Sequence, residues 1–324
     1  QFWRGNSAGL GGFFFFARES YERAQSLLAK TDSSHANVYR SLALHALNRP
    51  AEALQLLQSR RATEPENLQC LLALSRTQEA AEAKATLDLA ARLAPDSPQP
   101  LFERALFYRD RATERALQEA EELVKRWPDS ADFWYLKGEL LRMLSRFEAS
   151  IQAYDRAIAL DPDYALAWLF KAEMLRTLGQ PFIEAAQRAV ELSPQESHAL
   201  AYLCQAYFFA GDYEKAIETG KRAVALRPDE QEAWHFVGLS YLRMRADGTD
   251  GLDSINARAG LAAERHYLEE AIKAFQGLLN FNPRDCRSRT LMGESLATLG
   301  RDSLAREALG LAEDSATLDV HVLG

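Results

Sequence analysis

Residues 131–164 read ADFWYLKGELLRMLSRFEASIQAYDRAIALDPDY, and a proline stands close to the end of this stretch. Its apolar residues recur at intervals of three and four, which is the spacing of helices that bury one face. Small residues, Gly138 and Ala157, stand among the large residues Trp134 and Tyr154. This combination predicts two helices that approach closely at the small residues, with the large side chains filling the space beside them.

The same pattern recurs along the rest of the chain. Residues 197–230 carry Gly211 and Ala223 at the corresponding places, and residues from 231 onward carry Trp234 and Gly238. Prolines recur at intervals of roughly 30–34 residues, apart from a longer last interval. The seven prolines that mark this period are Pro65, Pro95, Pro128, Pro162, Pro194, Pro228 and Pro283. A fixed period of this length predicts stacked helix pairs rather than one globular core.

These residues and their spacing resemble the signature of the tetratricopeptide repeat family. The resemblance implies an all-α fold, an α-solenoid in which antiparallel helix pairs form a right-handed superhelix. We expect residues 1–324 to form a single solenoid of about nine repeats. Their expected boundaries are 1–33 (partial), 34–63, 64–96, 97–130, 131–164, 165–196, 197–230, 231–285 and 286–324.

Two repeats depart from the period. The repeat 165–196 lacks two residues before Phe182, which therefore falls where alanine is usual. The repeat 231–285 carries an insertion, approximately 245–265, which begins as an acidic, glycine-containing loop. We expect the following helix to project about three turns beyond its neighbours. The aspartates of this loop do not have the spacing of an EF-hand, so no metal is expected there.

At the start of the sequence, positions 15, 17, 20, 24 and 27 of a further repeat are matched by Gly12, Phe14, Ala17, Tyr21 and Ala24. The residues before Gly12 then fall in its first helix, so the chain is expected to open inside a helix. We interpret it as a fragment of a longer array, and a mature terminus left by signal cleavage is the alternative. The run from Phe13 to Phe16 is expected to divide its rings between the core and a neighbour, or else to form an apolar end.

Composition limits the classes of function. Charged residues make up 26% and hydrophobic residues 47% of the chain, as in folded domains. The net charge of −8 argues against a nucleic-acid partner, and no run of about 20 apolar residues could span a membrane. Three cysteines lie far apart, Cys70, Cys204 and Cys286, which favours a reducing compartment such as the cytoplasm, while a periplasmic location stays open.

Motifs for catalysis and for cofactors are missing from the sequence. There is no Cys-x-x-Cys pair, no His-Glu-x-x-His and no phosphate-binding glycine loop followed by lysine. The six histidines are scattered. We therefore expect a protein that is not an enzyme and that binds no metal or cofactor.

In the family that the chain resembles, the first helix of each repeat lines a concave groove, chiefly through positions 2, 5, 9, 12 and 13. The resemblance implies these partner-binding residues: Tyr108, Arg109, Tyr135, Glu139, Arg142, Glu173, Arg176, Gln205, Phe208, Phe209, His235 and Arg243. Arginine and aromatic side chains are frequent binding hot spots. The alternative is that Glu139 with Arg142, and Glu173 with Arg176, form solvated ion pairs that contribute little.

The function expected from these features is a non-enzymatic scaffold. It would hold a partner segment in the concave groove or form part of a multiprotein assembly, and the four groove arginines suggest a partner with acidic character. One alternative is a regulatory or substrate-recruiting region of a larger enzyme. A further possibility is homo-oligomerisation through uncapped ends. The asparagine clamp with which related co-chaperones hold heat-shock proteins is missing from the groove positions.

Overall fold

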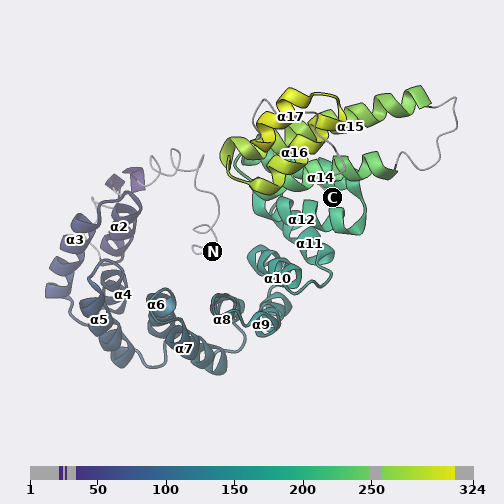
Figure 1. The fold of residues 1–324 in the computed structure, drawn as a ribbon. Helices are drawn as coiled ribbons and strands as arrows, with labels where there is room; N and C mark the ends of the chain where they lie inside the picture. Colours follow the sequence, from purple (N-terminus) through teal and green to yellow (C-terminus); the bar gives the residue numbers. More distant parts are fainter. Residues whose placement is uncertain (1–21, 25, 28–33, 248–256, 311–324) are drawn as a thin grey trace. The chain divides into compact units, whose positions relative to one another are not determined.

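The structure, a computed structural model, describes residues 22–24, 26–27, 34–247 and 257–310, and these ranges contain helices and turns but no strand (Figure 1). The chain divides into two compact units, Gln1–Pro162 and Asp163–Gly324. The N-terminal unit contains α2 Ser34–Ala46, α3 Pro50–Thr63, α4 Leu68–Ser75, α5 Ala80–Leu93, α6 Pro98–Arg109, α7 Thr113–Arg126, α8 Ala131–Met143 and α9 Phe147–Leu160. The C-terminal unit contains α10 Ala165–Thr177, α11 Ile183–Leu192, α12 Ser197–Ala210, α13 Tyr213–Leu226, α14 Gln231–Asp247, α15 Ala257–Phe281, α16 Cys286–Thr298 and α17 Asp302–Leu309.

Within each unit, consecutive helices pack against each other, and the second helix of one repeat also packs against the first helix of the next. First helices contact one another directly, α2 with α4 in the N-terminal unit, and α12 with both α10 and α14 in the C-terminal unit. This is the packing of an α-solenoid, and it confirms the predicted all-α fold of stacked helix pairs. Residues 1–21, including Phe13 to Phe16, lie outside the described residues.

The small residues of the repeat lie where its two helices touch. One position of the second helix is alanine in six repeats, and each of these alanines is at most 1% exposed: Ala53, Ala83, Ala116, Ala216, Ala271 and Ala305. A Cβ atom placed on Gly138 would lie 2.6 Å from Tyr154 Cε1, and one on Gly238 would lie 2.6 Å from Phe275 Cε1. The glycines therefore make room for a ring on the facing helix.

Turns inside the repeats share one backbone conformation. The residue at position 15 is in the left-handed region in five repeats, with φ values of 58°, 57°, 67°, 80° and 69° at Asn48, Ser145, Gly179, Gly211 and Gly300. Glycine and asparagine tolerate this region better than other residues do. A short turn between the two helices follows, which keeps them antiparallel and adjacent.

The two irregular repeats differ from the others in helix length. Helix α11 has 10 residues where α9 and α13 have 14, and Phe182, directly before α11, is buried in the space beside the shortened helix. Helix α15 has 25 residues, eleven more than α13, which adds about three turns. Residues 248–256 lie outside the described ranges. In the part of the chain that the structure describes, no helix combines the length and the apolar character that crossing a bilayer requires.

Candidate partner-binding surface

The N-terminal unit holds five of the predicted groove residues on two first helices. Tyr108 and Arg109 end α6, while Tyr135, Glu139 and Arg142 lie along α8. Tyr108 is buried, so its ring belongs to the core more than to the surface. Tyr135 is half-buried and lies beside the buried ring of Tyr154, with 6.0 Å between the ring centroids.

Arg109 is exposed but its charge is compensated. Its Nε donates to Asp110 Oδ1 and its Nη2 to Asp110 Oδ2, both at 3.1 Å. This hydrogen bonding raises the pKa of Arg109 and lowers the pKa of Asp110. An acidic ligand that approached Arg109 would therefore compete with a carboxylate already in place.

Glu139 joins the predicted groove to the core. Arg142 donates from Nε and Nη2 to the two carboxylate oxygens of Glu139, each at 3.2 Å. The hydroxyl of Tyr154 donates to Glu139 Oε1 at 2.6 Å, although the Tyr154 ring is fully buried. Burial, followed by the charge of Glu139, raises the pKa of Tyr154. The ion-pair alternative thus describes the contact that Arg142 makes in this structure.

In the C-terminal unit, Glu173 and Arg176 lie on α10. The guanidinium carbon of Arg176 lies 5.4 Å from the ring centroid of Tyr202 on α12, a cation–π contact between two first helices. Burial first, and then the nearby charge of Glu173, raises the pKa of Tyr202. Arg176 therefore stabilises the stacking of α10 on α12.

Four aromatic side chains of the C-terminal unit form one cluster, which we call the α12–α14 aromatic cluster: Phe208, Phe209, Tyr213 and Phe236. The ring centroid of Phe208 lies 5.5 Å from that of Phe209, 5.8 Å from that of Tyr213 and 5.3 Å from that of Phe236. The ring centroids of Phe209 and Phe236 are 5.8 Å apart. Phe208, Tyr213 and Phe236 are half-buried, whereas Phe209 is 65% exposed.

Three more predicted residues lie on α12 and α14. Gln205 is buried, and its Oε1 has no hydrogen-bond partner among the described residues. His235 packs edge-on against Phe236 at 5.5 Å, its Nδ1 lies 3.3 Å from Ser288 Oγ, and burial, followed by the charge of Arg287, lowers its pKa. Arg243 is exposed and forms no hydrogen bond or ion pair with a described residue.

The predicted residues therefore form two local groups. In the N-terminal unit Tyr135, Glu139 and Arg142 meet around Tyr154, and in the C-terminal unit Phe208, Phe209 and His235 meet around Phe236. The four arginines are divided between the two compact units, and their roles as partner-binding residues stay predictions. Sequence reasoning missed Phe236 because position 6 is outside the groove set, although an aromatic residue beside His235 was a visible signal.

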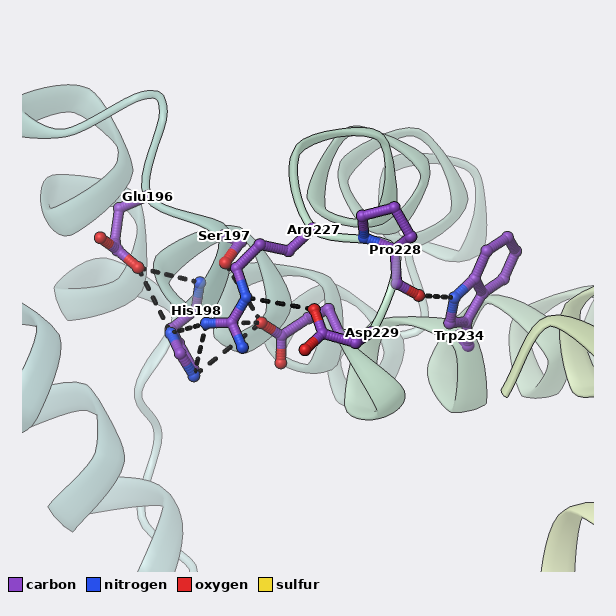
Figure 2. Close-up of polar contacts among 8 residues, drawn as sticks. Glu196, Ser197, His198, Arg227, Pro228, Asp229 and Trp234 are labelled. Carbon is purple, nitrogen blue, oxygen red and sulfur yellow. Dashed lines mark hydrogen bonds and ion pairs between the residues drawn. The ribbon is translucent and has the colours of Figure 1, made fainter. Parts of the chain in front are cut away.

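A polar cluster outside the predicted groove joins two turns between repeats (Figure 2). His198 Nδ1 lies 3.3 Å from Glu196 Oε1 and 3.1 Å from Arg227 Nη1, and its Nε2 lies 3.9 Å from Glu230 Oε2. Ser197 Oγ donates to the same Glu230 oxygen at 3.2 Å. The hydrogen bond to Glu196 raises the pKa of His198, against an opposing effect of burial. The described ranges bring together no set of three side chains able to hold a metal ion.

Comparison with known protein families also indicates a repeat protein. Residues 104–165, 144–181 and 183–238 match family models described as tetratricopeptide repeat. No curated protein matches the chain significantly in sequence.

The chain is similar to several solved structures at low sequence identity. One is YrrB, described as a tetratricopeptide repeat protein with an unusual peptide-binding site, with a TM-score of 0.51, 15% identity, and coverage of 62% of this chain and 95% of that chain. A second is the Cut9–Hcn1 hetero-tetramer, with a TM-score of 0.49, 17% identity, and coverage of 93% of this chain and 58% of that chain. A third is the human IFIT1 dimer with m7Gppp-AAAA, with a TM-score of 0.46, 17% identity, and coverage of 95% of this chain and 74% of that chain. The likeness to YrrB concerns the fold alone. Because nearly all of residues 104–238 match the repeat models, and the same packing of helix pairs continues on both sides of them, the chain belongs to the tetratricopeptide repeat superfamily.

Proposed function

We propose that the chain is a protein-interaction scaffold that holds a segment of a partner protein against the exposed side of its first helices. Superfamily membership supports the general role, since these repeats are protein-interaction modules and are generally not catalytic. The observation that carries the proposal is the α12–α14 aromatic cluster, in which the exposed ring of Phe209 packs against the rings of Phe208 and Phe236. Exposed aromatic side chains held in place by their neighbours are favourable anchors for a partner.

Only one of the four predicted groove arginines is available to bind an acidic group of the partner. Arg109 and Arg142 are bound to Asp110 and Glu139, and Arg176 packs on Tyr202. Arg243 has no such compensation from a described residue. We therefore assign the recognition of acidic groups to the surface around Arg243, and contact with apolar groups to the aromatic cluster.

The test is capture of partners from a lysate of the source cells by the immobilised full chain. The double variant Phe209→Ala, Arg243→Ala should lose specific partners, after circular dichroism has established that its helix content is unchanged. The control is the double variant Arg222→Ala, Phe281→Ala, which removes an exposed arginine of α13 and an exposed phenylalanine of α15, both on second helices. Recovery of the same partners in the same amounts by the Phe209→Ala, Arg243→Ala variant would overturn the proposal.

A further inference from the structure

We propose that His198 is a protonation-dependent switch at the joint between two inter-repeat turns of the C-terminal unit. Protonation of its ring releases the guanidinium of Arg227 and makes the imidazolium the counter-charge of Glu230. The switch lies in the polar cluster of Figure 2, outside the predicted groove, and it does not depend on the proposed function.

The joint connects the turn before α12 with the turn before α14. Ser197 and His198 are the first residues of α12, Arg227 follows α13, and Glu230 directly precedes α14. Ser197 Oγ donates to Glu230 Oε2 at 3.2 Å, and both residues are buried. This hydrogen bond holds the starts of the two helices together. The group that compensates the charge of Glu230 therefore contributes to the stacking of consecutive repeats.

The ring of His198 lies between an arginine and a carboxylate. Arg227 Nη1 is 3.1 Å from Nδ1 and 3.4 Å from Nε2 of the ring, and Glu196 Oε1 is 3.3 Å from Nδ1. A neutral imidazole has one N–H and one lone pair. With the proton on Nδ1, it donates to Glu196, and Nε2 accepts from Arg227. The neutral ring therefore satisfies both neighbours.

An imidazolium cannot keep both contacts. Both of its nitrogens are donors, so the ring offers Arg227 no acceptor, and its charge repels the guanidinium at close range. On the Nε2 side, Glu230 Oε2 lies 3.9 Å away, within the range of an ion pair. The released guanidinium has a partner in the exposed Asp229, whose Oδ1 is 3.4 Å from Arg227 Nε.

The charge balance of the cluster favours uptake of this proton. With a neutral ring, three carboxylates, those of Glu196, Asp229 and Glu230, share one arginine. Glu230 Oε2 lies 3.8 Å from Arg227 Nη1, so the guanidinium is its counter-charge until the imidazolium takes over this role. The hydrogen bond to Glu196 raises the pKa of His198, which moves the exchange of partners towards neutral pH.

Charged side chains on the helices that pack against α12 have partners other than the imidazole. Among the described residues, the charges in contact with the ring come only from the two turns. On the packed helices, Glu173 (α10) and Glu232 (α14) act on Tyr202, Glu191 (α11) pairs with Arg188, and Lys221 (α13) donates to Tyr241.

The experiment follows both side chains of the switch in the full chain by NMR, with 13C-labelled histidine and 15N-labelled arginine, between about pH 5 and about pH 8.5. We expect the ring signals of His198 and the Nε signal of Arg227 to shift with one shared midpoint, because release of the guanidinium follows protonation of the ring. The Arg227 signal should lose this pH dependence in His198→Gln. Arg222, an exposed arginine of α13, is the internal control, and its signal should stay constant.

Protein variants identify the charges that the ring exchanges. Arg227→Gln removes a positive charge beside the ring, so the midpoint of His198 should rise. Glu230→Gln and Glu196→Gln each remove a negative charge, so the midpoint should fall. The matched control Arg222→Gln should leave the midpoint of His198 unchanged.

Three results would overturn the inference. A constant Arg227 signal while His198 titrates would mean that the guanidinium is not released, and this reading needs only the wild type. An Arg227 response that persists in His198→Gln would assign the effect to the carboxylates. A His198 midpoint that Arg227→Gln does not raise, or that Glu230→Gln does not lower, would mean that the ring does not exchange the one for the other.

Discussion

At single positions, the fold depends on matched sizes across the two helices of a repeat. Gly138 faces Tyr154 and Gly238 faces Phe275. In the repeat 197–230 the glycine stands on the second helix instead: a Cβ atom on Gly220 would lie close to Val237 Cγ2 of the next first helix and 2.9 Å from Cys204 Sγ. The packing therefore requires a small residue where the helices touch, and either helix of a repeat can supply it.

Gly138→Leu should lower the free energy of unfolding by about 1–3 kcal/mol, because the new side chain overlaps the Tyr154 ring. Urea unfolding of the full chain, followed by circular dichroism, measures the change. The double variant Gly138→Leu, Tyr154→Ala should lose less stability than the two single variants added together, since the leucine then occupies the space of the ring. An unfolding midpoint that Gly138→Leu does not shift would contradict this assignment of the repeat register.

Two histidines of the C-terminal unit should respond to pH with opposite signs. The hydrogen bond to Glu196 raises the pKa of His198 in the folded state, so its stabilisation is present below the unfolded pKa, about 6.5, and is lost as the pH rises through the folded pKa. Burial lowers the pKa of His235, so its contribution is present above about 6.5 and is lost as the pH falls through the folded pKa.

The measurement compares the urea midpoint of the wild type with those of His198→Gln and His235→Gln at about pH 5.5 and about pH 8.5. The advantage of the wild type over His198→Gln should be larger at the lower pH, and its advantage over His235→Gln larger at the higher pH. The comparison of differences removes the contribution of the carboxylates that interact with neither histidine. If the difference in urea midpoint between the wild type and each variant did not change with pH, the pKa shifts of His198 and His235 would be contradicted.

Among whole elements, the turns inside repeats and the 245–265 segment determine how long each helix is. The left-handed residue at position 15 ends the first helix in five repeats. The repeat with α14 and α15 has no such turn after Arg243. Instead α14 continues to Asp247, α15 begins at Ala257, and Arg245 Nε pairs with Glu264 Oε1 at 3.3 Å across the two extended helices.

Removal of residues 245–265 should leave the array folded if a left-handed turn replaces them. Deletion of this segment brings His266 to position 15, so the deletion is combined with His266→Gly. Far-ultraviolet circular dichroism should lose only the signal of the helical extension, and the unfolding midpoint should change little, since loop length has a weak effect on stability. The matched control, the same deletion with His266→Val, should be less stable because a β-branched residue resists positive φ. A collapse of helicity in the glycine variant would mean that the segment packs as part of the core.

For the whole molecule, stability arises from contacts between neighbouring repeats rather than from one centre. Buried residues of α16 and α17, such as Met292, Leu296 and Ala305, share a core cluster with Phe275 and Leu279 of α15. Arg301 adds a hydrogen bond from Nη2 to Glu269 Oε1 at 3.1 Å. In a repeat array of this kind, removal of one repeat mainly destabilises the adjacent repeat, because each repeat contacts only its neighbours.

Deletion of residues 286–324 should therefore reduce amide protection in α14 and α15 far more than in α6 to α9. Hydrogen–deuterium exchange with mass spectrometry measures this for each helix. The apolar surface of α15 that the deletion exposes should also promote self-association, which light scattering detects. Equal loss of protection in every helix would indicate one cooperative unit in place of nearest-neighbour stabilisation.

Much of the fold could be predicted from local sequence patterns. Less of the candidate partner-binding surface could be predicted in this way. The proline period, the helical spacing of apolar residues and the buried alanines were readable because each depends on residues within one repeat. The resemblance to the repeat family implied that Phe208 and Phe209 occupy groove positions. Their partner Phe236 was not predicted, because it belongs to the next repeat and meets Phe208 only when α12 and α14 pack together.

For the groove arginines, the sequence predicted their positions, and the tertiary packing decided which of their charges are compensated. The sequence was sufficient to place an arginine near the end of the first helix in four repeats, since helix geometry and period decide that position. Packing decided which of them has a compensated charge: Arg142 is bound to a glutamate that the buried Tyr154 hydroxyl holds, and Arg176 lies over Tyr202 of the next first helix. Helix periodicity acts over three or four residues, whereas hydrogen bonds and ring contacts between helices depend on how side chains interlock across the interface, which no local pattern specifies.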